Sequence, residues 1–400
     1  MEYVNLDTLV WFQEGPGVRN YQYVDKGIKL INVTNLVNGQ LKLHLTSRYI
    51  SEEEAFGKYK HFLCDNGDLV IASSGITYET LSKKIAFVTE KDLPLCMNTS
   101  VIRFKPINHD VCIDYIYYFF KSEKYRNQIS KLMTGSAQLN YGPSHLHKVK
   151  IPYYDIVKQT KIADELKKID ENISICYRNI DNLDNIVKSQ FIEMFGDLTL
   201  NPYGWPIMKI SDISKFIKSG LSRKLSDKDI GFPVIRSGNI QNGELIFDDI
   251  KYWYKEDPQG AKTDEYILED SDILVNFINS VSQIGKSAIF RDVGRDCIYT
   301  TNIFRMKLNE SCNEYYYNWF AMSQYYYSQL ENIIKPAVNQ ASFTTVNFLK
   351  LNIPLPPIDL QNKFANFVQQ IDKSKFNMKD IIIVMVICLK IYFGQFILYN

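Results

Sequence analysis

Residues 148–170 read "KVKIPYYDIVKQTKIADELKKID", and a related stretch, "KLNIPLPPIDLQNKFANFVQQID", occupies residues 350–372. A second pair lies upstream, where "GIKLINVTNLVNGQL" at residues 27–41 matches "GFPVIRSGNIQNGEL" at residues 231–245. The pairs occur in the same order, at offsets of 202 and 204 residues (350 minus 148, and 231 minus 27). Agreement in order over this length indicates an internal duplication.

Each copy of the first stretch opens a long helical pattern. Between Thr160 and Phe195 there is no proline or glycine, and apolar residues recur at alternating steps of four and three. This spacing predicts a coiled-coil seam on a helix about 50 Å long, too long for one globular core. The first seam contains Ile162, Leu166, Ile169, Ile173, Cys176, Ile180, Leu183 and Val187. The second contains Phe364, Val368, Ile371, Lys375, Met378, Ile382, Met385 and Leu389, so one of its positions is a lysine.

The segments outside these helices predict compact units that mix strands and helices. Short β-branched runs alternate with turn signals such as Asn38-Gly39 and Asn242-Gly243, and an aromatic-rich helical stretch closes each copy. We predict a mixed α/β (α+β) fold with two similar domains related by a pseudo-twofold axis and separated by a long antiparallel two-helix coiled coil. The predicted divisions are a first domain at 1–152, a central helical spacer at 153–197, a second domain at 198–354 and a C-terminal helical spacer at 355–400.

Composition narrows the class of protein. The chain has 400 residues, 46% hydrophobic and 23% charged, with a formal net charge of +1. This near-neutral balance argues against a protein that coats DNA by excess positive charge. The seven cysteines are scattered without a C-x-x-C pair, and the first residues lack the pattern of a signal peptide. We therefore expect reduced thiols and a cytoplasmic location.

One alternative is a nucleotide-binding enzyme, because Gly285-Lys286-Ser287 is how a phosphate-binding P-loop ends. The first glycine of that motif is replaced by Ser280, and "SAIF" after Lys286 predicts a strand instead of the required helix. The matching segment of the first copy has Ser82 in place of Gly285. The shared feature is therefore a strand, although a P-loop-like NTPase remains an alternative.

A second alternative is a membrane-tethered scaffold. Residues 381–400, "IIIVMVICLKIYFGQFILYN", form an apolar run about long enough to span a bilayer. Lys390 in the middle of that run would be costly there. We favour a paired helix and expect no membrane contact.

The chain resembles the specificity subunit of type I restriction-modification systems. The resemblance rests on the two repeated stretches and on further motifs in the same order. These are "GPGVRN" (15–20), "TGSAQLNYGPSHL" (134–146), "KSQFIEMFGD" (188–197), "GDLTLNPYGWPIMKISDI" (196–213), "AVNQASFTTVNFLKLNIPLPPIDLQ" (337–361) and "YFGQF" (392–396).

The resemblance implies two target recognition domains, each reading one half of a bipartite DNA sequence. The helices would set the spacing between the halves and dock two modification (methyltransferase) subunits. Those partners would bind S-adenosylmethionine and methylate adenine, while restriction subunits would supply the ATP-driven motor and the Mg-dependent nuclease. The chain itself would be non-catalytic and would bind no cofactor.

Sequence-specific readout requires polar side chains at base edges in the major groove, and phosphate contacts favour Arg and Lys. Loop-like stretches supply such residues in both halves, although the same residue types also cap turns. The candidates in the first half are Arg19, Asn20, Asn32, Thr34, Asn35, Thr134, Gln138 and Asn140. Those in the second half are Ser222, Arg223, Lys224, Arg236, Ser237, Asn239, Lys286, Asn339 and Gln340.

No catalytic or metal-binding constellation is predicted. The string nearest to the proline-rich loop of an adenine methyltransferase is "NPYGW" from Asn201, which predicts a turn. All five histidines lie in the first half, so the second half has no equivalent cluster.

Overall fold

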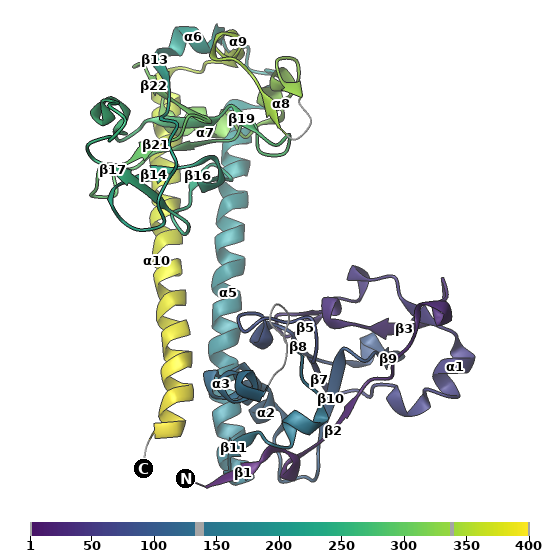
Figure 1. The fold of residues 1–400 in the computed structure, drawn as a ribbon. Coiled ribbons are helices and arrows are strands. Elements are labelled where there is room, and N and C mark those ends of the chain that lie inside the picture. The colour runs from purple at the N-terminus through teal and green to yellow at the C-terminus, as the bar shows by residue number, and fades with distance from the viewer. Residues whose placement is uncertain (1, 133–139, 337–339, 399–400) are drawn as a thin grey trace. The chain divides into compact units, whose positions relative to one another are not determined.

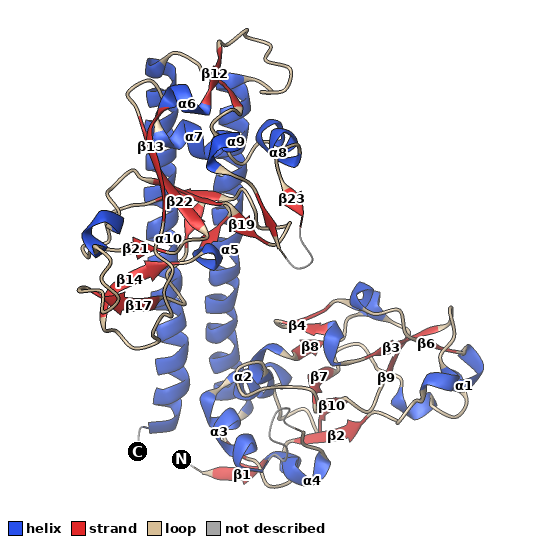
Figure 2. Cartoon of the chain, turned by 45° about the horizontal axis from the view of Figure 1, so that its top comes forward, coloured by secondary structure: helices blue, strands red, loops and turns tan. Residues whose placement is uncertain are grey.

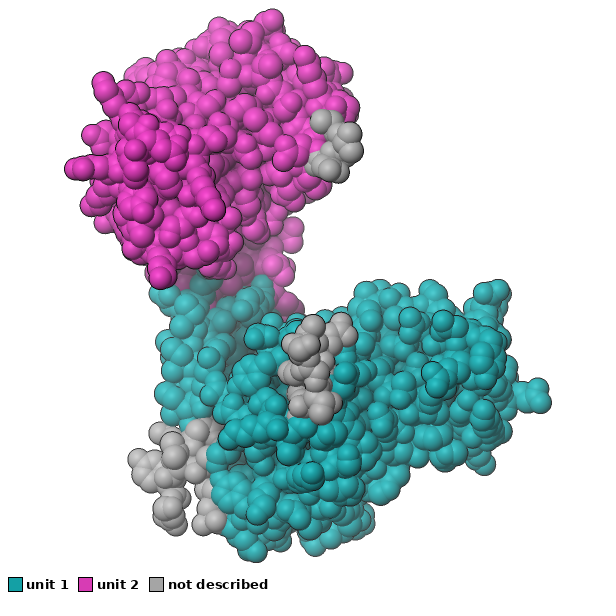
Figure 3. Space-filling view, in the orientation of Figure 1, with its two compact units in different colours: residues 1–177, 379–400 teal, residues 178–378 magenta. Residues whose placement is uncertain are grey.

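The computed structural model describes residues 2–132, 140–336 and 340–398. The chain divides into two compact units (Figure 3): residues 1–177 with 379–400, and residues 178–378. The predicted divisions treat each long helix as a separate segment, whereas each compact unit contains part of both helices.

Unit 1 contains a four-stranded antiparallel sheet and a smaller three-stranded sheet (Figure 1). The larger sheet has the order β2 (Val10–Glu14), β10 (Val101–Pro106), β7 (Leu69–Ala72), β8 (Ile85–Phe87). The smaller sheet has the order β6 (Tyr49–Ile50), β3 (Ile28–Ile31), β9 (Leu95–Met97), with β3 and β9 parallel. The remaining elements are β1 (Tyr3–Asn5) paired with β11 (Lys150–Pro152), the hairpin β4 (Leu36–Val37) and β5 (Gln40–Leu41), and helices α1 (Glu52–Phe56), α2 (Ile113–Lys121), α3 (Glu123–Leu132), α4 (Pro143–Leu146) and α5 (Ile156–Phe195).

Unit 2 repeats this topology (Figure 2). Its four-stranded sheet is β13 (Ser214–Ser219), β22 (Ile303–Leu308), β18 (Ile273–Asn276), β20 (Ser287–Ile289), and its smaller sheet is β17 (Lys251–Tyr254), β14 (Gly231–Ile235), β21 (Ile298–Tyr299). Further pairs are β12 (Ile207–Lys209) with β25 (Asn352–Pro354) and β15 (Ile240–Gln241) with β16 (Glu244–Leu245). The helices are α6 (Ile210–Ile213), α7 (Glu314–Phe320), α8 (Gln324–Glu331), α9 (Thr345–Phe348) and α10 (Ile358–Leu398), and a small sheet contains β19 (Ile278–Asn279), β24 (Ala341–Ser342) and β23 (Lys335–Pro336). The predicted mixed fold with an internal duplication is confirmed.

The aromatic-rich helices pack into the two cores. Tyr125 of unit 1 and Tyr316 and Tyr326 of unit 2 are fully buried. Tyr115 Oη donates to Pro152 O at 2.8 Å, and its counterpart Tyr316 also donates to a proline carbonyl, that of Pro354. These rings therefore form core contacts in the structure, as helical spacing of large apolar residues predicts.

The coiled-coil prediction is confirmed, since every seam position on both helices is buried or partly buried. Within unit 2, the ring of Phe364 lies 5.4 Å from those of Phe191 and Phe195, while Lys375 pairs with Asp184 further back along α5, so the helices run antiparallel. Within unit 1, Leu389 of α10 packs against the core that contains Ile162 and Leu166. Both ribbon views draw α5 and α10 side by side (Figures 1 and 2).

The segment around Gly285-Lys286-Ser287 is a turn followed by a strand, as its sequence predicts. β20 begins at Ser287 and pairs antiparallel with β18. Gly285 N donates to Asn276 O at 2.7 Å and Lys286 N to Gln283 O at 3.4 Å, so these amides are not free to bind phosphate. Gly285 has φ 81°, and a Cβ there would lie 2.2 Å from Leu330 Cδ1. The glycine thus serves the turn and its packing, and the P-loop alternative has no support.

Within the described residues, no helix, α10 included, combines the length and the apolar character that a membrane crossing requires. The same part contains no group of three or more His, Cys, Asp or Glu side chains that could hold a metal ion.

Candidate nucleic-acid interface

A short turn follows the central strand of the smaller sheet in each unit. In unit 1 it is the 3-10 turn Val33–Asn35 after β3, and in unit 2 the turn Ser237–Asn239 after β14. Asn35 and Asn239 are buried and equivalent. Each accepts from a backbone N–H three residues earlier, at 3.0 Å from Asn32 and 2.8 Å from Arg236. Their amide groups also donate to the following hairpin, at Lys42 O and Ile246 O. These two candidates hold the turn in shape, which leaves the exposed Thr34 of unit 1 as a free side chain of the turn.

The residue before each turn differs between the units. Asn32 is buried, and its Oδ1 accepts from Asn98 Nδ2 at 3.0 Å and from Arg48 Nη1 at 3.2 Å. In unit 2 the position is Arg236, whose Nη2 donates to both the carbonyl and the carboxylate of Asp249 at 2.7 Å. The Arg236 side chain is 32% exposed and its partner Asp249 is 74% exposed, so solvent or a ligand can compete for this pair. Arg236 can therefore exchange a surface ion pair for a base or phosphate contact.

A loop in unit 2, residues 277–286, lies against this turn. The candidates predicted from the sequence include only Lys286 of this loop. Asn276, fully buried at the end of β18, donates through Nδ2 to Ser237 O at 3.1 Å and sits opposite Gln283 O at 3.5 Å. Residues 277–286 are thereby held beside the Ser237 turn. Pairing of β19 with β24 brings the exposed Gln340 to the same loop, since Asn279 faces Ala341. In the sequence, the one feature that could have identified Asn276 as a candidate is the position of its amide side chain at the end of an apolar strand.

Two lysines occupy the same position in the duplicated hairpins. Lys286 O accepts from Asn276 N and Lys84 O from Ala72 N, both at 2.9 Å, and β8 and β20 start at the following residue. Lys84 is therefore the counterpart of the predicted Lys286. Both lysines are partly exposed, and neither ammonium group has an ion-pair or hydrogen-bond partner among the described residues. The sequence match of Ser82 with Gly285 would make Lys83 the counterpart of Lys286, whereas the strand pairing makes it Lys84, one residue later.

The other candidates lie at several places on the two units. Leu221 and Ile235 both form backbone hydrogen bonds with residues at the end of β21. The segment that contains Ser222 and Lys224 therefore starts beside the Arg236 turn. Arg223 is directed instead to Asp257, with Nε and Nη2 at 2.8 and 2.6 Å from Oδ2, and this hydrogen bond lowers the pKa of the Asp257 carboxyl. In unit 1 the exposed candidates Arg19, Asn20 and Asn140 have no described link to the Asn35 turn, and Thr134, Gln138 and Asn339 lie outside the described residues.

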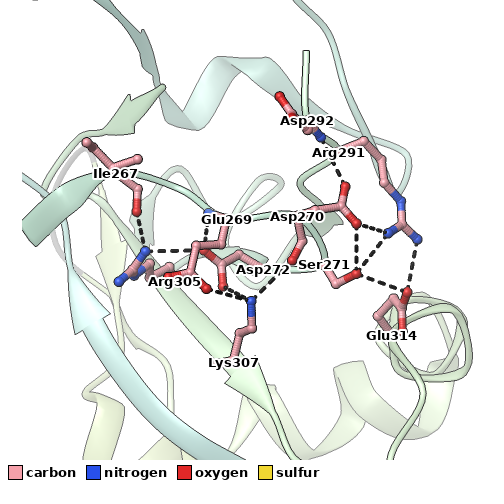
Figure 4. A network of polar contacts seen from close by, with 10 residues as sticks. All are labelled: Ile267, Glu269, Asp270, Ser271, Asp272, Arg291, Asp292, Arg305, Lys307 and Glu314. Atoms are coloured by element: carbon pink, nitrogen blue, oxygen red, sulfur yellow. Dashed lines mark hydrogen bonds and ion pairs between the residues drawn. The ribbon is translucent and has the colours of Figure 1, made fainter. Parts of the chain in front are cut away.

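A buried ionic network stiffens the sheet that carries the loop (Figure 4). At the start of β18, the Asp272 carboxylate contacts Arg305 Nη1 at 3.3 Å and Lys307 Nζ at 3.5 Å. Unit 1 has the same pair of contacts, from Asp68 to Arg103 and Lys105. Burial raises the pKa of both aspartates. The network lies at the end of β18 opposite to Asn276, so its charged groups do not take part in the loop beside the Ser237 turn.

The comparisons with known proteins agree with this duplicated arrangement. The family model described as "Type I restriction modification DNA specificity domain" matches residues 19–184 and 202–383. A putative type I restriction enzyme MjaX specificity subunit of Methanocaldococcus jannaschii is 30% identical over 172 residues, which are 43% of this chain and 40% of that protein. The EcoKI specificity subunit of Escherichia coli (strain K12) is 20% identical over 271 residues, 64% of this chain and 58% of that protein. The matches thus span less than two thirds of the length of these two curated relatives.

Two solved structures have a similar fold. The S subunit of a type I restriction-modification system from M. genitalium is 14% identical with a TM-score of 0.54, over 98% of this chain and 94% of that one. A chain from a structural study of type I R-M complex assembly and conformational transition is 13% identical with a TM-score of 0.56, over 98% and 96%. Because the two ranges matched by the family model take up most of the 400 residues, the chain belongs to the family of type I restriction-modification DNA specificity domains.

Proposed function

We propose that this chain is the DNA-binding specificity subunit of a type I restriction-modification complex, in which each unit is a target recognition domain that reads one half of a bipartite DNA sequence. The observation that carries this proposal is the duplicated surface. The turns at Asn35 and Asn239, and the lysines Lys84 and Lys286, occur once in each unit on equivalent strands. Two equivalent readers on one chain suit a target with two half-sites.

Within each surface, we assign different roles to different side chains. Lys84 and Lys286 would contact phosphate, since a lysine without a protein partner offers charge but little base discrimination. Arg236, Ser237 and Gln340 would read bases in unit 2, and Thr34 in unit 1. The buried amides of Asn32, Asn35 and Asn239 would shape the turns that present these readers.

The chemistry would belong to partner subunits. We propose that the chain is non-catalytic and that the helices dock two modification subunits, which bind S-adenosylmethionine and methylate adenine. Restriction subunits would bring ATP, Mg and the nuclease. This assignment rests on family membership, and it implies assembly on DNA in the cytoplasm without membrane contact.

The proposed function is tested by single-molecule sequencing of adenine methylation in cells that do and do not express this chain with its partner subunits. We expect methylation at one bipartite motif, with two specified half-sites and a fixed unspecified spacer, that disappears when the chain is deleted. A methylome that is the same with and without the chain would contradict the proposal.

A further inference from the structure

One seam position of α10 is occupied by a charged residue. Lys375 is 8% exposed, yet it lies in the row that otherwise carries Phe, Val, Ile, Met and Leu. Its Nζ lies 2.7 Å from Asp184 Oδ1 on α5 and 3.1 Å from Glu244 Oε1 on β16, with Asp372 Oδ1 at 3.9 Å. A single ammonium group therefore joins the two helices and the β15–β16 hairpin of unit 2.

A buried charged residue in a seam lowers the stability of the helix pair, but it favours one register of the two helices over others. Removing an ammonium group from water is unfavourable, and an apolar side chain would fill the seam at lower cost. A shift of α10 along α5 by one turn, about 5.4 Å, would separate Lys375 from both Asp184 and Glu244. In one direction the shift would bring the lysine to Asp181 on α5, but the contact with the β15–β16 hairpin would be lost. The observed register is therefore the one in which Lys375 contacts both helices and the hairpin, and polar residues at single seam positions of coiled coils select a register in this way.

The charge is retained in this position. Burial alone would lower the pKa of Lys375, but the hydrogen bond to Asp184 and the charge of Glu244 outweigh burial, so the pKa is raised. The ammonium group stays protonated at neutral pH, and the bridge is present under ordinary conditions.

The duplication supplies an internal comparison. The residues of unit 1 that correspond to Lys375 and Asp184 are Ile173 and Val386, at an offset of 202 residues, and Gln40 corresponds to Glu244 at an offset of 204. Ile173 is partly buried, and Gln40 and Val386 are exposed. An apolar residue is thus accepted at this seam position, so the ionic bridge in unit 2 is not a requirement of helix pairing.

We propose that Lys375 is a positioning residue that sets the register of α10 on α5 and ties the β15–β16 hairpin to both helices, and that it thereby restricts the DNA spacer length that the complex accepts. The DNA part of this inference rests on the proposed function. The structural part concerns unit 2 alone.

The first test replaces Lys375 with the residue that the other copy carries, K375I, in the full chain assembled with its partner subunits. We expect a melting temperature equal to or above that of wild type, because replacing a buried ion pair with an apolar side chain is often neutral or stabilising. We also expect amide exchange in residues 240–245 to become about tenfold faster, since the hairpin loses its tie. In the methylome, the same half-sites should then be modified at neighbouring spacer lengths as well.

The control is K373M, which removes an exposed lysine two residues away on the same helix and should change neither exchange nor spacing. A charge reversal provides a rescue. K375E places a third carboxylate beside Asp184 and Glu244 and should release the hairpin, whereas K375E/D184K/E244K restores the opposite charges and should restore hairpin protection and the single spacer.

The outcomes separate the inference from the proposed function. K375I complexes that keep wild-type hairpin exchange and one spacer length would overturn the role of Lys375. Wild-type complexes that methylate no bipartite motif would instead overturn the proposed function, and hairpin exchange in K375I would still decide whether the bridge positions unit 2.

Discussion

At the scale of single residues, one side-chain type serves two purposes in this chain. The amides of Asn35 and Asn239 are buried and hydrogen-bonded to their own turns, while Thr34, in the turn of unit 1, and Gln340, next to β24 of unit 2, are exposed. A polar residue in a loop-like stretch can serve either to contact a DNA base or to hold the geometry of a turn, and its residue type does not distinguish these roles. Burial separates the two roles, and the sequence does not show burial at such positions.

Arg236 offers the sharpest test of base readout. We expect Arg236→Ala to reduce methylation of one half-site by about 5- to 150-fold, because a bidentate base contact contributes about 1–3 kcal/mol. Asp249→Asn should have no such effect and should strengthen binding, since it weakens the ion pair that holds the guanidinium. The measurement is methylation of oligonucleotide duplexes that carry single changes in either half-site.

The control for Arg236 is Arg295→Ala, which removes an exposed arginine of unit 2 that is paired with Asp229. It should leave the modified motif unchanged. Equal losses at both half-sites in R236A, together with a lowered melting temperature, would mean that Arg236 supports the fold and does not read DNA.

Lys84 and Lys286 test the phosphate contacts. We expect Lys84→Gln and Lys286→Gln to weaken binding of specific and unrelated DNA to the same extent. Each should reduce the slope of log K against log salt concentration by about 1, as the loss of one phosphate contact requires. Fluorescence anisotropy over a range of salt concentrations measures both quantities.

Lys91→Gln is the matched control, because Lys91 is an exposed lysine of unit 1 on a different loop. A change in preferred sequence in either Lys84→Gln or Lys286→Gln would contradict a phosphate role.

These residues also show a limit of sequence comparison. Only the pairing of β7 with β8 and of β18 with β20 identifies Lys84 as the partner of Lys286, since the repeat has a gap in this hairpin.

At the scale of elements, the long helices were predictable because their burial has a simple period. Alternating steps of four and three correspond to one stripe on a helix, and this stripe is buried or partly buried in the structure. The polar residues that attach the helices are different. Gln159 and Gln361 are fully buried near the start of α5 and α10, and no period distinguishes them from surface glutamines.

Each of these glutamines makes equivalent hydrogen bonds. Gln361 Oε1 accepts from Asn313 N at 2.8 Å, and its Nε2 donates to Ser311 O and Pro356 O. Gln159 does the same with Cys112 N, Asp110 O and Tyr154 O. The two residues join the helix starts to the segments before α2 and α7.

We expect Gln159→Leu and Gln361→Leu each to lower the free energy of unfolding by about 1–3 kcal/mol, because the substitutions leave buried backbone groups without partners. Denaturant unfolding measures the loss, and hydrogen exchange should locate it in unit 1 for Gln159 and in unit 2 for Gln361. Gln369→Leu, at an exposed position of α10, is the control. Losses below about 0.5 kcal/mol would show that water replaces these bonds.

At the scale of the whole molecule, the duplication was evident from the sequence, but the composition of each unit was not. Periodicity showed two helices that pair. It did not show that the last part of α10 belongs to the unit that contains the first residues of the chain. That arrangement depends on contacts between residues more than 200 positions apart, such as those of Leu389 with the core around Ile162.

This arrangement predicts that a substitution near the C-terminal end of α10 affects unit 1. We expect Leu389→Asp to destabilise unit 1 by about 1–3 kcal/mol, since Leu389 packs on its core. Val384→Asp, on an exposed face of the same helix, should have little effect. Hydrogen exchange resolved by peptide is the measurement. Faster exchange confined to unit 2 in L389D would contradict the assignment.

The assignment of residues 379–400 to unit 1 also has a consequence for biosynthesis. Protein domains generally fold as units while the ribosome is still translating, N-terminal domain first. Here the unit that is translated first obtains its last helical segment only after residues 178–378 of unit 2 have been translated. Until then the part of the unit 1 core that Leu389 packs against stays uncovered, so nascent chains would present an apolar binding site for chaperones throughout the synthesis of unit 2.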